Sequence, residues 1–322
     1  MDAILHEIPE NPMPEGTVAG MMAAGDGRRI RYARFPLRGA KGTVVVLPGR
    51  NESIEKYFET VRDLAARGFA AAALDWRGQG GSERLLTDPM RGHIESFDDY
   101  VEDLDLFFTR IVLPDCRPPY TILAHSTGAL IALLAVPDLA SRVRRMVLTA
   151  PLIEVRAPLS QRWITRFAGL CFAFGLGRRS LPGSGRRGKE TPFQGNRLTS
   201  DAERYARNLA LVRTYPELAL GAPTMAWLRA ACIATERVRD PDFMAAIRLP
   251  ILFLAAGNDE VVSTPAIERY ARGLRSARVL TIDGARHELL QEADPYREQA
   301  LAAFNAFAAP QQNEETPSAQ AG

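Results

Sequence analysis

A serine lies where a strand-like segment gives way to a helix-like one. Residues 121–124 form a short apolar run that predicts a buried strand, and residues 129–136 continue as an apolar helix. Ser126 falls in the turn between them. A serine at the apex of a strand, a sharp turn and a helix is the setting of a nucleophile that attacks a carbonyl carbon. A serine that merely caps a helix gives the same local pattern, so this chemistry also requires a base and an acid elsewhere in the chain.

Such a turn is strained and brings neighbouring chain close, which favours small residues two places before and two places after the serine. Ala124 and Gly128 occupy these places. The common pattern has glycine at the first of them, so Ala124 is a departure by one methyl group. The two small residues strengthen the prediction of a nucleophile at Ser126.

The base is expected to be a histidine, and the chain has four: His6, His93, His125 and His287. The first lies in an acidic N-terminal leader, and the second lies in a loop that precedes the serine. His125 is bonded directly to Ser126 and is expected to point elsewhere. His287 remains, after a predicted strand at 278–282, and we assign it as the base. The alternative is a histidine of an ordinary surface loop.

The acid that orients the histidine should lie between Ser126 and His287 in the chain, because the order in this arrangement is serine, acid, histidine. A predicted strand at 251–255 ends in a loop that contains Asp259 and Glu260. Both acids lie at a suitable place, and one of them is expected to be an ordinary loop residue. We choose Asp259 as the acid and keep Glu260 as the alternative.

Ester hydrolysis also needs backbone amides that stabilise the oxyanion. The amide of Thr127, directly after the nucleophile and at the start of a helix, is the first candidate. The second is the amide of Arg50, in the loop 48–53 after a predicted strand, where Gly49 allows a close turn. A plain strand-to-helix connection is the alternative for this loop.

Alternating strands and helices position these residues. A hairpin at 21–35, which turns at Asp26-Gly27, is expected to add an antiparallel edge. Apolar residues at spacings of three and four predict helices at 53–67 and 97–112. Short apolar runs predict parallel strands at 44–47, 70–74, 121–124 and 146–149. The alternation predicts an α/β fold with a mostly parallel sheet flanked by helices.

The alternation breaks for almost a hundred residues after Pro151. It resumes with a strand at 251–255, a helix at 265–274, a strand at 278–282 and a helix at 295–307. We therefore predict one core, residues 17–150 and 246–309, that is interrupted by a helical insertion at 151–245. Residues 1–16 form the N-terminal leader. Residues 310–322 lack apolar periodicity and are predicted to be disordered.

The composition excludes several classes of protein. Forty Lys and Arg residues against 38 Asp and Glu residues leave a net charge of +2, which argues against a nucleic-acid-binding protein. Three widely separated cysteines favour neither a disulfide framework nor a metal site, and we expect no metal or organic cofactor. No signal peptide is visible, and the longest nearly polar-free run, 167–177, is about half of the roughly 20 residues that span a bilayer. These features predict a cytoplasmic protein.

Five segments together resemble a known family. They read Leu-Pro-Gly-Arg-Asn-Glu-Ser at 47–53, Asp-Trp-Arg-Gly-Gln-Gly-Gly-Ser at 75–82, Leu-Ala-His-Ser-Thr-Gly at 123–128, Gly-Asn-Asp-Glu-Val-Val at 257–262 and Gly-Ala-Arg-His-Glu at 284–288. Between about Val18 and Phe307 the chain resembles the α/β-hydrolases. It is most similar to the branch of bacterial lysophospholipases and monoacylglycerol lipases. Ala124 and the Pro-Gly-Arg-x-Glu-Ser loop favour the lysophospholipases.

The resemblance implies the α/β-hydrolase fold, with the insertion as a helical cap over the site. It implies Ser126, Asp259 and His287 as the catalytic triad and the amides of Arg50 and Thr127 as the oxyanion hole. The implied reaction is hydrolysis of the acyl ester of a single-chain lipid, in the first place a lysophospholipid, through an acyl-enzyme on the serine. A monoacylglycerol lipase or general carboxylesterase is the nearest alternative. A non-catalytic binding protein on the same fold is the second.

A glycine-rich segment that begins at Arg77 could be taken for a phosphate-binding loop. It reads Arg-Gly-Gln-Gly and lacks the Gly-Lys-Ser/Thr ending that such a loop requires. We interpret it as the connection after the strand 70–74. Arg77 is then expected to form a structural ion pair, with Glu52 as the suggested partner.

The insertion is basic, since residues 151–250 contain sixteen Lys and Arg residues but eight Asp and Glu residues. An apolar stretch at 167–176 lies between Arg166 and a basic loop at 178–189. This pattern predicts peripheral contact with an anionic membrane surface, at the inner face of the membrane. The alternative is a cap helix packed on the core, with solvated arginines. Three bulky residues of the stretch are expected to leave room for one acyl chain: Phe167, Phe172 and Phe174.

Overall fold

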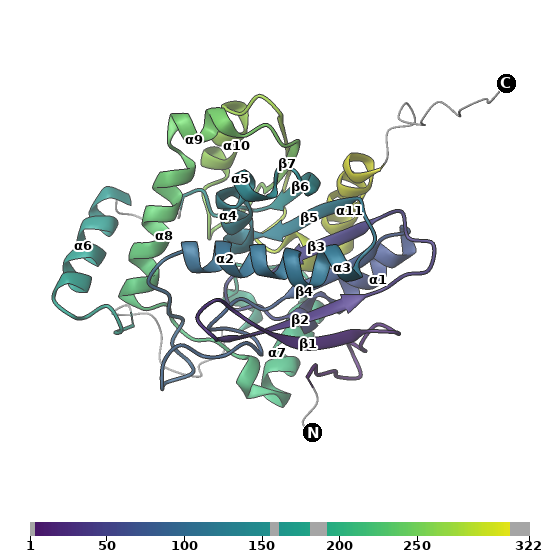
Figure 1. Cartoon of the computed structure of the whole chain (residues 1–322), viewed down its shortest axis with the longest axis horizontal. Coiled ribbons are helices and arrows are strands. Elements are labelled where there is room, and N and C mark those ends of the chain that lie inside the picture. The colour runs from purple at the N-terminus through teal and green to yellow at the C-terminus, as the bar shows by residue number, and fades with distance from the viewer. Residues whose placement is uncertain (1–3, 155–160, 181–191, 310–322) are drawn as a thin grey trace.

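The computed structural model describes residues 4–154, 161–180 and 192–309 of the chain. Within these residues, eight strands form one sheet in the order β1-β2-β4-β3-β5-β6-β7-β8 (Figure 1). The strands are β1 (Val18–Ala23), β2 (Arg29–Phe35), β3 (Thr43–Leu47), β4 (Ala70–Leu74), β5 (Tyr120–His125), β6 (Val143–Thr149), β7 (Ile251–Ala256) and β8 (Ala277–Ile282). Neighbouring strands from β4 across to β8 are parallel, and β1 and β2 are antiparallel at one edge. The structure confirms the predicted mostly parallel sheet and its edge hairpin.

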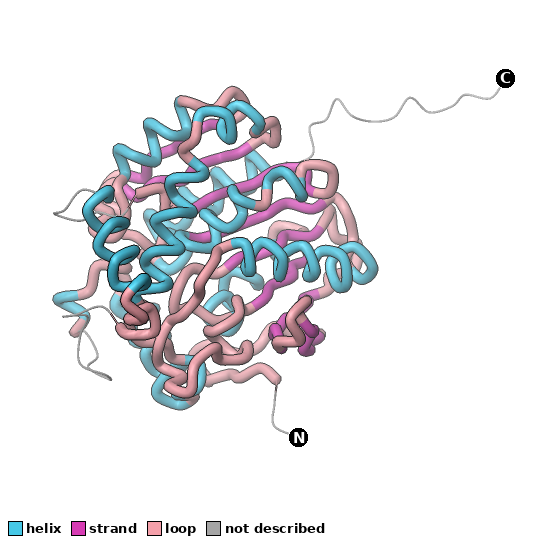
Figure 2. Tube along the Cα trace, turned by 60° about the vertical axis from the view of Figure 1, so that its left-hand side comes forward, coloured by secondary structure: helices cyan, strands magenta, loops and turns pink. Residues whose placement is uncertain are grey.

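Helices cover both faces of the sheet (Figure 2). Successive side chains of a strand point to opposite faces, so in β3 Val45 and Leu47 join one core cluster while Val44 and Val46 join the other. The first cluster includes helices α2 (Asp98–Phe107), α4 (Ser126–Leu134), α8 (Met225–Val238) and α10 (Thr264–Arg272), and the second includes α1 (Phe58–Ala66) and α11 (Asp294–Ala308). Burial on both faces explains why the strands read as continuous apolar runs.

The predicted helices are present, with local changes at their ends. The segment predicted as a helix at 53–67 begins with one 3-10 turn, Ile54–Tyr57, and continues as α1. The segment at 97–112 forms α2 and a π-helical turn, Phe108–Val112, before the short α3 (Leu113–Asp115). Helix α4 is buried along its whole length, which is why it is apolar on every side. A short helix, α5 (Val136–Leu139), follows it.

The chain between β6 and β7 forms helices and their connections in the part that the structure describes. These are α6 (Gln161–Ala173), a turn at Phe193–Gly195, α7 (Ala202–Thr214), a turn at Pro216–Leu218, α8 and α9 (Pro241–Ala246). Helix α6 packs against α8 and projects at one side of the molecule, whereas α7 lies near the N-terminus (Figure 1). The described part of the insertion is helical, as predicted.

Two of the three phenylalanines that were expected to line the acyl site are exposed. Phe167 is 53% exposed and Phe174, just after the helix, is 74% exposed. Phe172 is partly buried beneath the guanidinium of Arg229, which lies 4.8 Å from its ring centroid. The structure does not place these side chains around an acyl site, so the expectation that they leave room for one chain stays a prediction. Among the described residues, no helix combines the length and the apolar character needed to cross a membrane.

Two further predictions lie outside the described residues. The basic loop was predicted at 178–189. Its first three residues are described, but the rest lies in the segment 181–191, outside the described residues. The tail at 310–322, predicted to be disordered, also lies outside them.

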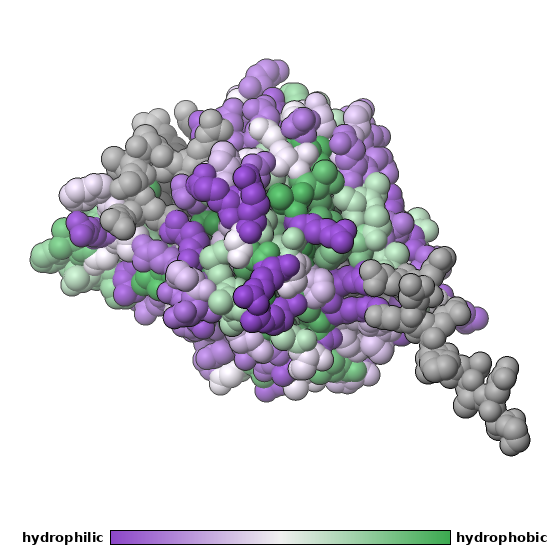
Figure 3. Space-filling model, turned by 90° about the horizontal axis from the view of Figure 1, so that it is seen from above, coloured by the Kyte–Doolittle hydropathy of each residue, from purple (hydrophilic) through white to green (hydrophobic). Residues whose placement is uncertain are grey.

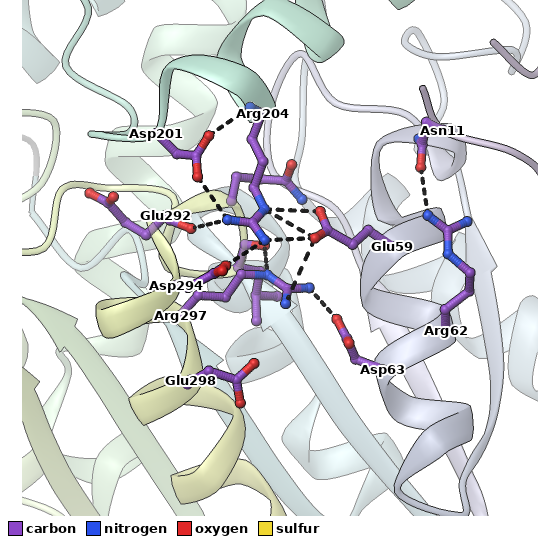
Figure 4. A network of polar contacts seen from close by, with 12 residues as sticks. Asn11, Glu59, Arg62, Asp63, Asp201, Arg204, Glu292, Asp294, Arg297 and Glu298 are labelled. Atoms are coloured by element: carbon purple, nitrogen blue, oxygen red, sulfur yellow. Dashed lines mark hydrogen bonds and ion pairs between the residues drawn. The ribbon is translucent and has the colours of Figure 1, made fainter. Parts of the chain in front are cut away.

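Helix α7 is anchored to the core by ion pairs (Figure 4). The guanidinium of Arg204 lies 2.7 Å from Glu59 of α1, 2.7 Å from Asp294 of α11 and 2.8 Å from Asp201. Arg207 binds the same Glu59 carboxylate at 2.6 Å. Because these contacts join α7 to two core helices at once, they fix this part of the insertion against the sheet layer.

The N-terminal leader packs on both the core and the insertion. Leu5 and Ile8 are buried, and Ile8 contacts Leu211 and Leu218 of the insertion. The carbonyl oxygen of Ile4 accepts a hydrogen bond of 2.9 Å from Arg31.

Candidate active site

Ser126 lies at a strained turn, where β5 ends and α4 begins. Its φ of +50° falls in the left-handed region that non-glycine residues seldom adopt. A Cβ atom at Gly128 would lie 2.4 Å from the carbonyl oxygen of Pro48. Glycine therefore permits the neighbouring loop to approach the turn, which is the physical reason for the small residue after the serine.

Three side chains from separate loops form one hydrogen-bonded chain. Nε2 of His287 lies 3.0 Å from Oγ of Ser126, and Nδ1 of His287 lies 2.8 Å from Oδ2 of Asp259. All three residues are buried. They meet because β5, β7 and β8 are parallel and end at the same edge of the sheet. In this arrangement the imidazole can accept the serine proton while the carboxylate fixes its tautomer.

Asp259, and not Glu260, faces the histidine. Oδ1 of Asp259 accepts hydrogen bonds from the amides of Val261 at 2.7 Å and Val262 at 2.9 Å. Burial by itself would raise the pKa of Asp259, but the hydrogen bond and charge of His287 and the two amides together lower it. The carboxyl is therefore ionised at neutral pH. Glu260 is exposed, and its carboxylate lies 3.3 Å from Nε of Arg197.

The loop 48–53 is held by side chains from the neighbouring connection. The indole N–H of Trp76 donates to the carbonyl of Pro48 at 2.7 Å, and the side-chain amide of Gln79 donates to the carbonyl of Gly49 at 2.8 Å. The amide of Gly49 donates to Oε2 of Glu52 at 2.5 Å. These contacts fix the backbone that presents the next amide along the chain.

The two amides expected to form an oxyanion hole lie on adjoining segments. Gly49 lies close to the turn that carries Ser126, because a Cβ atom on it would be 3.0 Å from the ring of His125. Arg50 is the next residue in the chain. Thr127 lies in the first turn of α4, where backbone amides have no acceptor within the helix. The loop and the helix start therefore approach the nucleophile together.

His125 lies closer to the site than the sequence indicated. Its ring centroid is 4.8 Å from that of His287, and its Nδ1 lies 3.2 Å from the hydroxyl of Thr149. Burial lowers the pKa of His125 to about 4, although the charge of the Glu52 carboxylate acts to raise it. His125 is therefore neutral at pH 7 and lies next to His287. Bonding to Ser126 in the chain carries no information about the direction of its side chain.

A buried cluster of charges next to His287 was missed by sequence reasoning. Nζ of Lys56 lies 2.8 Å from Oε1 of Glu52 and 2.6 Å from Oε1 of Glu288. Glu288 directly follows His287, so Lys56 links the histidine segment to the loop 48–53. Burial opposes the ionisation of Glu52, but Lys56 and its other partners lower its pKa to about 2. The one available signal was the spacing of four residues between Glu52 and Lys56.

Arg77 does not pair with Glu52. Its Nε lies 2.7 Å from Asp103, and its Nη1 lies 3.2 Å from Asp26. The suggested partner is wrong because Glu52 is held by Lys56.

Comparisons with known proteins agree with one another. A family model described as serine aminopeptidase, S33, matches residues 38–294. Lysophospholipase L2 of Escherichia coli K12 is 37% identical over 309 residues, which cover 89% of this chain and 87% of that protein.

Two solved structures share the fold. A monoglyceride lipase of Saccharomyces cerevisiae matches with a TM-score of 0.71 at 16% identity, covering 91% of this chain and 96% of that chain. A carboxyl esterase of Bacillus coagulans matches with a TM-score of 0.73 at 17% identity, covering 92% of this chain and 98% of that chain. At these identities the likeness is one of fold.

Proposed function

The chain belongs to the serine aminopeptidase S33 family of α/β-hydrolases, and on this basis we propose that it hydrolyses the acyl ester of a lysophospholipid through an acyl-enzyme on Ser126. As a member of this family it is a carboxylic ester hydrolase. The observation that carries the proposed mechanism is the hydrogen-bonded chain from Ser126 through His287 to Asp259. The choice of substrate is supported by the 37% identical relative, which is named a lysophospholipase.

In the proposed mechanism, Oγ of Ser126 attacks the acyl carbonyl carbon as Nε2 of His287 takes its proton. Asp259 holds the imidazole in position and stabilises the imidazolium. The carbonyl oxygen becomes an oxyanion, which accepts hydrogen bonds from the amides of Arg50 and Thr127. The tetrahedral intermediate collapses, the ester bond breaks, and His287 returns the proton to the departing glycerol oxygen. Water, activated by His287 in the same way, then releases the fatty acid.

The substrate proposal predicts a preference for single-chain lipids. With matched palmitoyl chains, we expect lysophosphatidylcholine to be hydrolysed at least about tenfold faster than the diacyl lipid, a difference of about 1.4 kcal/mol in transition-state stabilisation. Fatty acid release is measured on one purified sample, together with monopalmitoylglycerol and p-nitrophenyl butyrate. Faster hydrolysis of the diacyl lipid would overturn the proposal. Faster hydrolysis of monopalmitoylglycerol would favour a monoacylglycerol lipase, and a preference for the short ester would favour a general carboxylesterase.

We also propose peripheral contact with an anionic membrane surface, through one face of α6. Three large apolar side chains on this helix are exposed, and they recur at spacings of four and three residues: Trp163 (64%), Phe167 (53%) and Leu170 (58%). Helix α6 contains no acidic residue, and the exposed Arg178 and Arg179 follow it. Apolar side chains are visible at the end of the molecule that α6 occupies (Figure 3). An apolar face next to basic side chains suits an anionic leaflet.

We therefore expect the protein to bind anionic liposomes but not neutral ones, with binding that weakens as salt rises. Each basic side chain near such a surface contributes about 1 kcal/mol, and salt screens this attraction within roughly 8 Å at physiological ionic strength. The triple variant Trp163→Ser, Phe167→Ser, Leu170→Ser should lose binding in co-sedimentation. The double variant Leu113→Ser, Leu280→Ser, at two exposed positions outside the insertion, is the matched control and should retain it. Equal, negligible binding of the natural protein to both liposome types at low salt would contradict the proposal.

A further inference from the structure

The side chain of Arg50 is a partly buried cation without a carboxylate partner among the described residues. Its Nη2 donates to the carbonyl oxygen of Gly221, and its guanidinium carbon lies 5.5 Å from the ring centroid of Trp227. Its Nε is buried and has no hydrogen-bond partner. Within the described residues, no acidic side chain is among the factors that influence its charge, which are burial and the phenol of Tyr100. A charged group that is largely removed from solvent is normally paired.

Two arginines that are more deeply buried do have carboxylate partners. Arg31 binds both Glu55 and Asp75, and Arg77 binds Asp103. Burial lowers the pKa of Arg50 to about 10, and its titratable neighbour Tyr100 is a neutral phenol whose pKa burial raises. Arg50 is therefore still positive at pH 7. It carries a charge that no anion of the described protein compensates.

Arg50 lies between the nucleophile and the insertion. Gly49 and Pro48, directly before it, touch the turn that carries Ser126. Its guanidinium reaches the segment around Gly221, which is tied back to the loop by a hydrogen bond of 2.8 Å from the amide of Leu220 to the side chain of Asn51. Gly92 also lies next to the guanidinium, since a Cβ atom on it would be 2.9 Å from Nη2 of Arg50. Glycine at position 92 therefore lets the chain pass close to the guanidinium without displacing it.

We propose that the Arg50 guanidinium binds the phosphate of the substrate's head group while the amide of the same residue faces the acyl carbonyl. This inference rests on the proposed function, in which the substrate is a lysophospholipid. The glycerol backbone separates the ester from the phosphate by only a few bonds, so the phosphate must lie close to Ser126 during the reaction. A guanidinium recognises a phosphate group through two parallel N–H···O hydrogen bonds, and Nε is one of the donors that such a pair uses. Binding supplies the missing anion, so the site favours phosphate-bearing esters over neutral ones.

The test compares two substrates with the same acyl chain, palmitoyl-lysophosphatidylcholine and monopalmitoylglycerol, in mixed micelles of fixed composition. For Arg50→Gln we expect the ratio of their kcat/KM values, lysophospholipid over monoacylglycerol, to fall roughly 10- to 100-fold, the range for hydrogen bonds to a charged group. The ratio is used because any disturbance of the shared oxyanion amide affects both substrates alike. Arg50→Lys keeps the charge without the planar pair of donors, and we expect an intermediate ratio.

Arg84→Gln is the matched control, because Arg84 also binds backbone carbonyls of this part of the insertion, including that of Ala219 at 3.1 Å. If Arg50 acted only by holding the segment, Arg84→Gln would lower the ratio in the same way. We expect it to leave the ratio within twofold of the natural value. An unchanged ratio in Arg50→Gln, or an equal fall in Arg84→Gln, would overturn the inference.

Two outcomes separate this inference from the proposed function. If the natural protein does not hydrolyse lysophospholipid at all, the proposed function fails. If it does so and Arg50→Gln keeps the natural ratio, only the inference fails. A free phosphate ion is the other source of the same chemistry. Inorganic phosphate that inhibits the natural enzyme as strongly as an equal concentration of an ether-linked lysophospholipid would assign the site to free phosphate and overturn the head-group proposal.

Discussion

Replacing Ser126 with alanine is expected to reduce ester hydrolysis by about 10⁶-fold, because triad members act as a unit and loss of the nucleophile leaves only binding and oxyanion stabilisation. The hydroxyl lies 3.0 Å from Nε2 of His287, so no other described side chain needs to move for the proton transfer. His287→Ala removes the base and is expected to reduce turnover by several orders of magnitude as well. Initial rates of fatty acid release measure both effects.

Labelling with a fluorophosphonate probe identifies the nucleophile independently of the substrate. We expect the natural protein to be labelled and Ser126→Ala to remain unlabelled. Ser263→Ala is the control, because Ser263 caps α10 outside the site and its loss should leave labelling intact. If Ser126→Ala kept more than about a tenth of the activity with the label on another residue, the assignment of the nucleophile would be wrong. A natural protein that neither reacts with the probe nor hydrolyses any ester would support the non-catalytic alternative.

The fold was predictable because its strands are buried on both faces. Residues 70–74 contain no polar side chain and 44–47 are all apolar, so each segment is read as a strand without knowledge of its neighbours. The order of strands in the sheet was not predicted, because β3 pairs with both β4 and β5 through contacts that no local pattern encodes. The edge hairpin was predictable because its turn is local, at Asp26-Gly27.

The candidate site was predictable only in part. The turn at Ser126 is a local feature, and His287 followed by elimination among four histidines. The contacts of Lys56 with Glu52 and Glu288 could not be inferred, because Glu288 is 232 residues away and a lysine next to a buried site has no distinctive sequence pattern. The direction of the α6 side chains was missed for a similar reason, since an amphipathic helix shows which residues share a face but not which partner covers it.

Asp259→Asn is expected to lower kcat on any ester by roughly 10³- to 10⁴-fold, less than the loss of Ser126, because the nucleophile and base remain in place. The asparagine side chain can present an N–H₂ group to Nδ1 of His287, which favours the tautomer with its proton on Nε2. In that tautomer the imidazole cannot accept the serine proton. The amides of Val261 and Val262, which bind the second oxygen, can still hold the asparagine oxygen, so the fold should survive.

Glu260→Gln is the matched control for this acid, since the two neighbours in the chain differ in burial and in partner. Asp259 is buried and lies 2.8 Å from Nδ1 of His287, whereas Glu260 is exposed and pairs with Arg197 at the surface. An exposed ion pair contributes about 0–1 kcal/mol to the free energy of unfolding, so Glu260→Gln should lower thermal stability only slightly. We expect its kcat to stay within about twofold of the natural value. The comparison is made on one ester at one pH, with circular dichroism to verify folding. A large loss of kcat in Glu260→Gln, with Asp259→Asn close to the natural rate, would transfer the role of the acid to Glu260 and leave Ser126 and His287 in theirs.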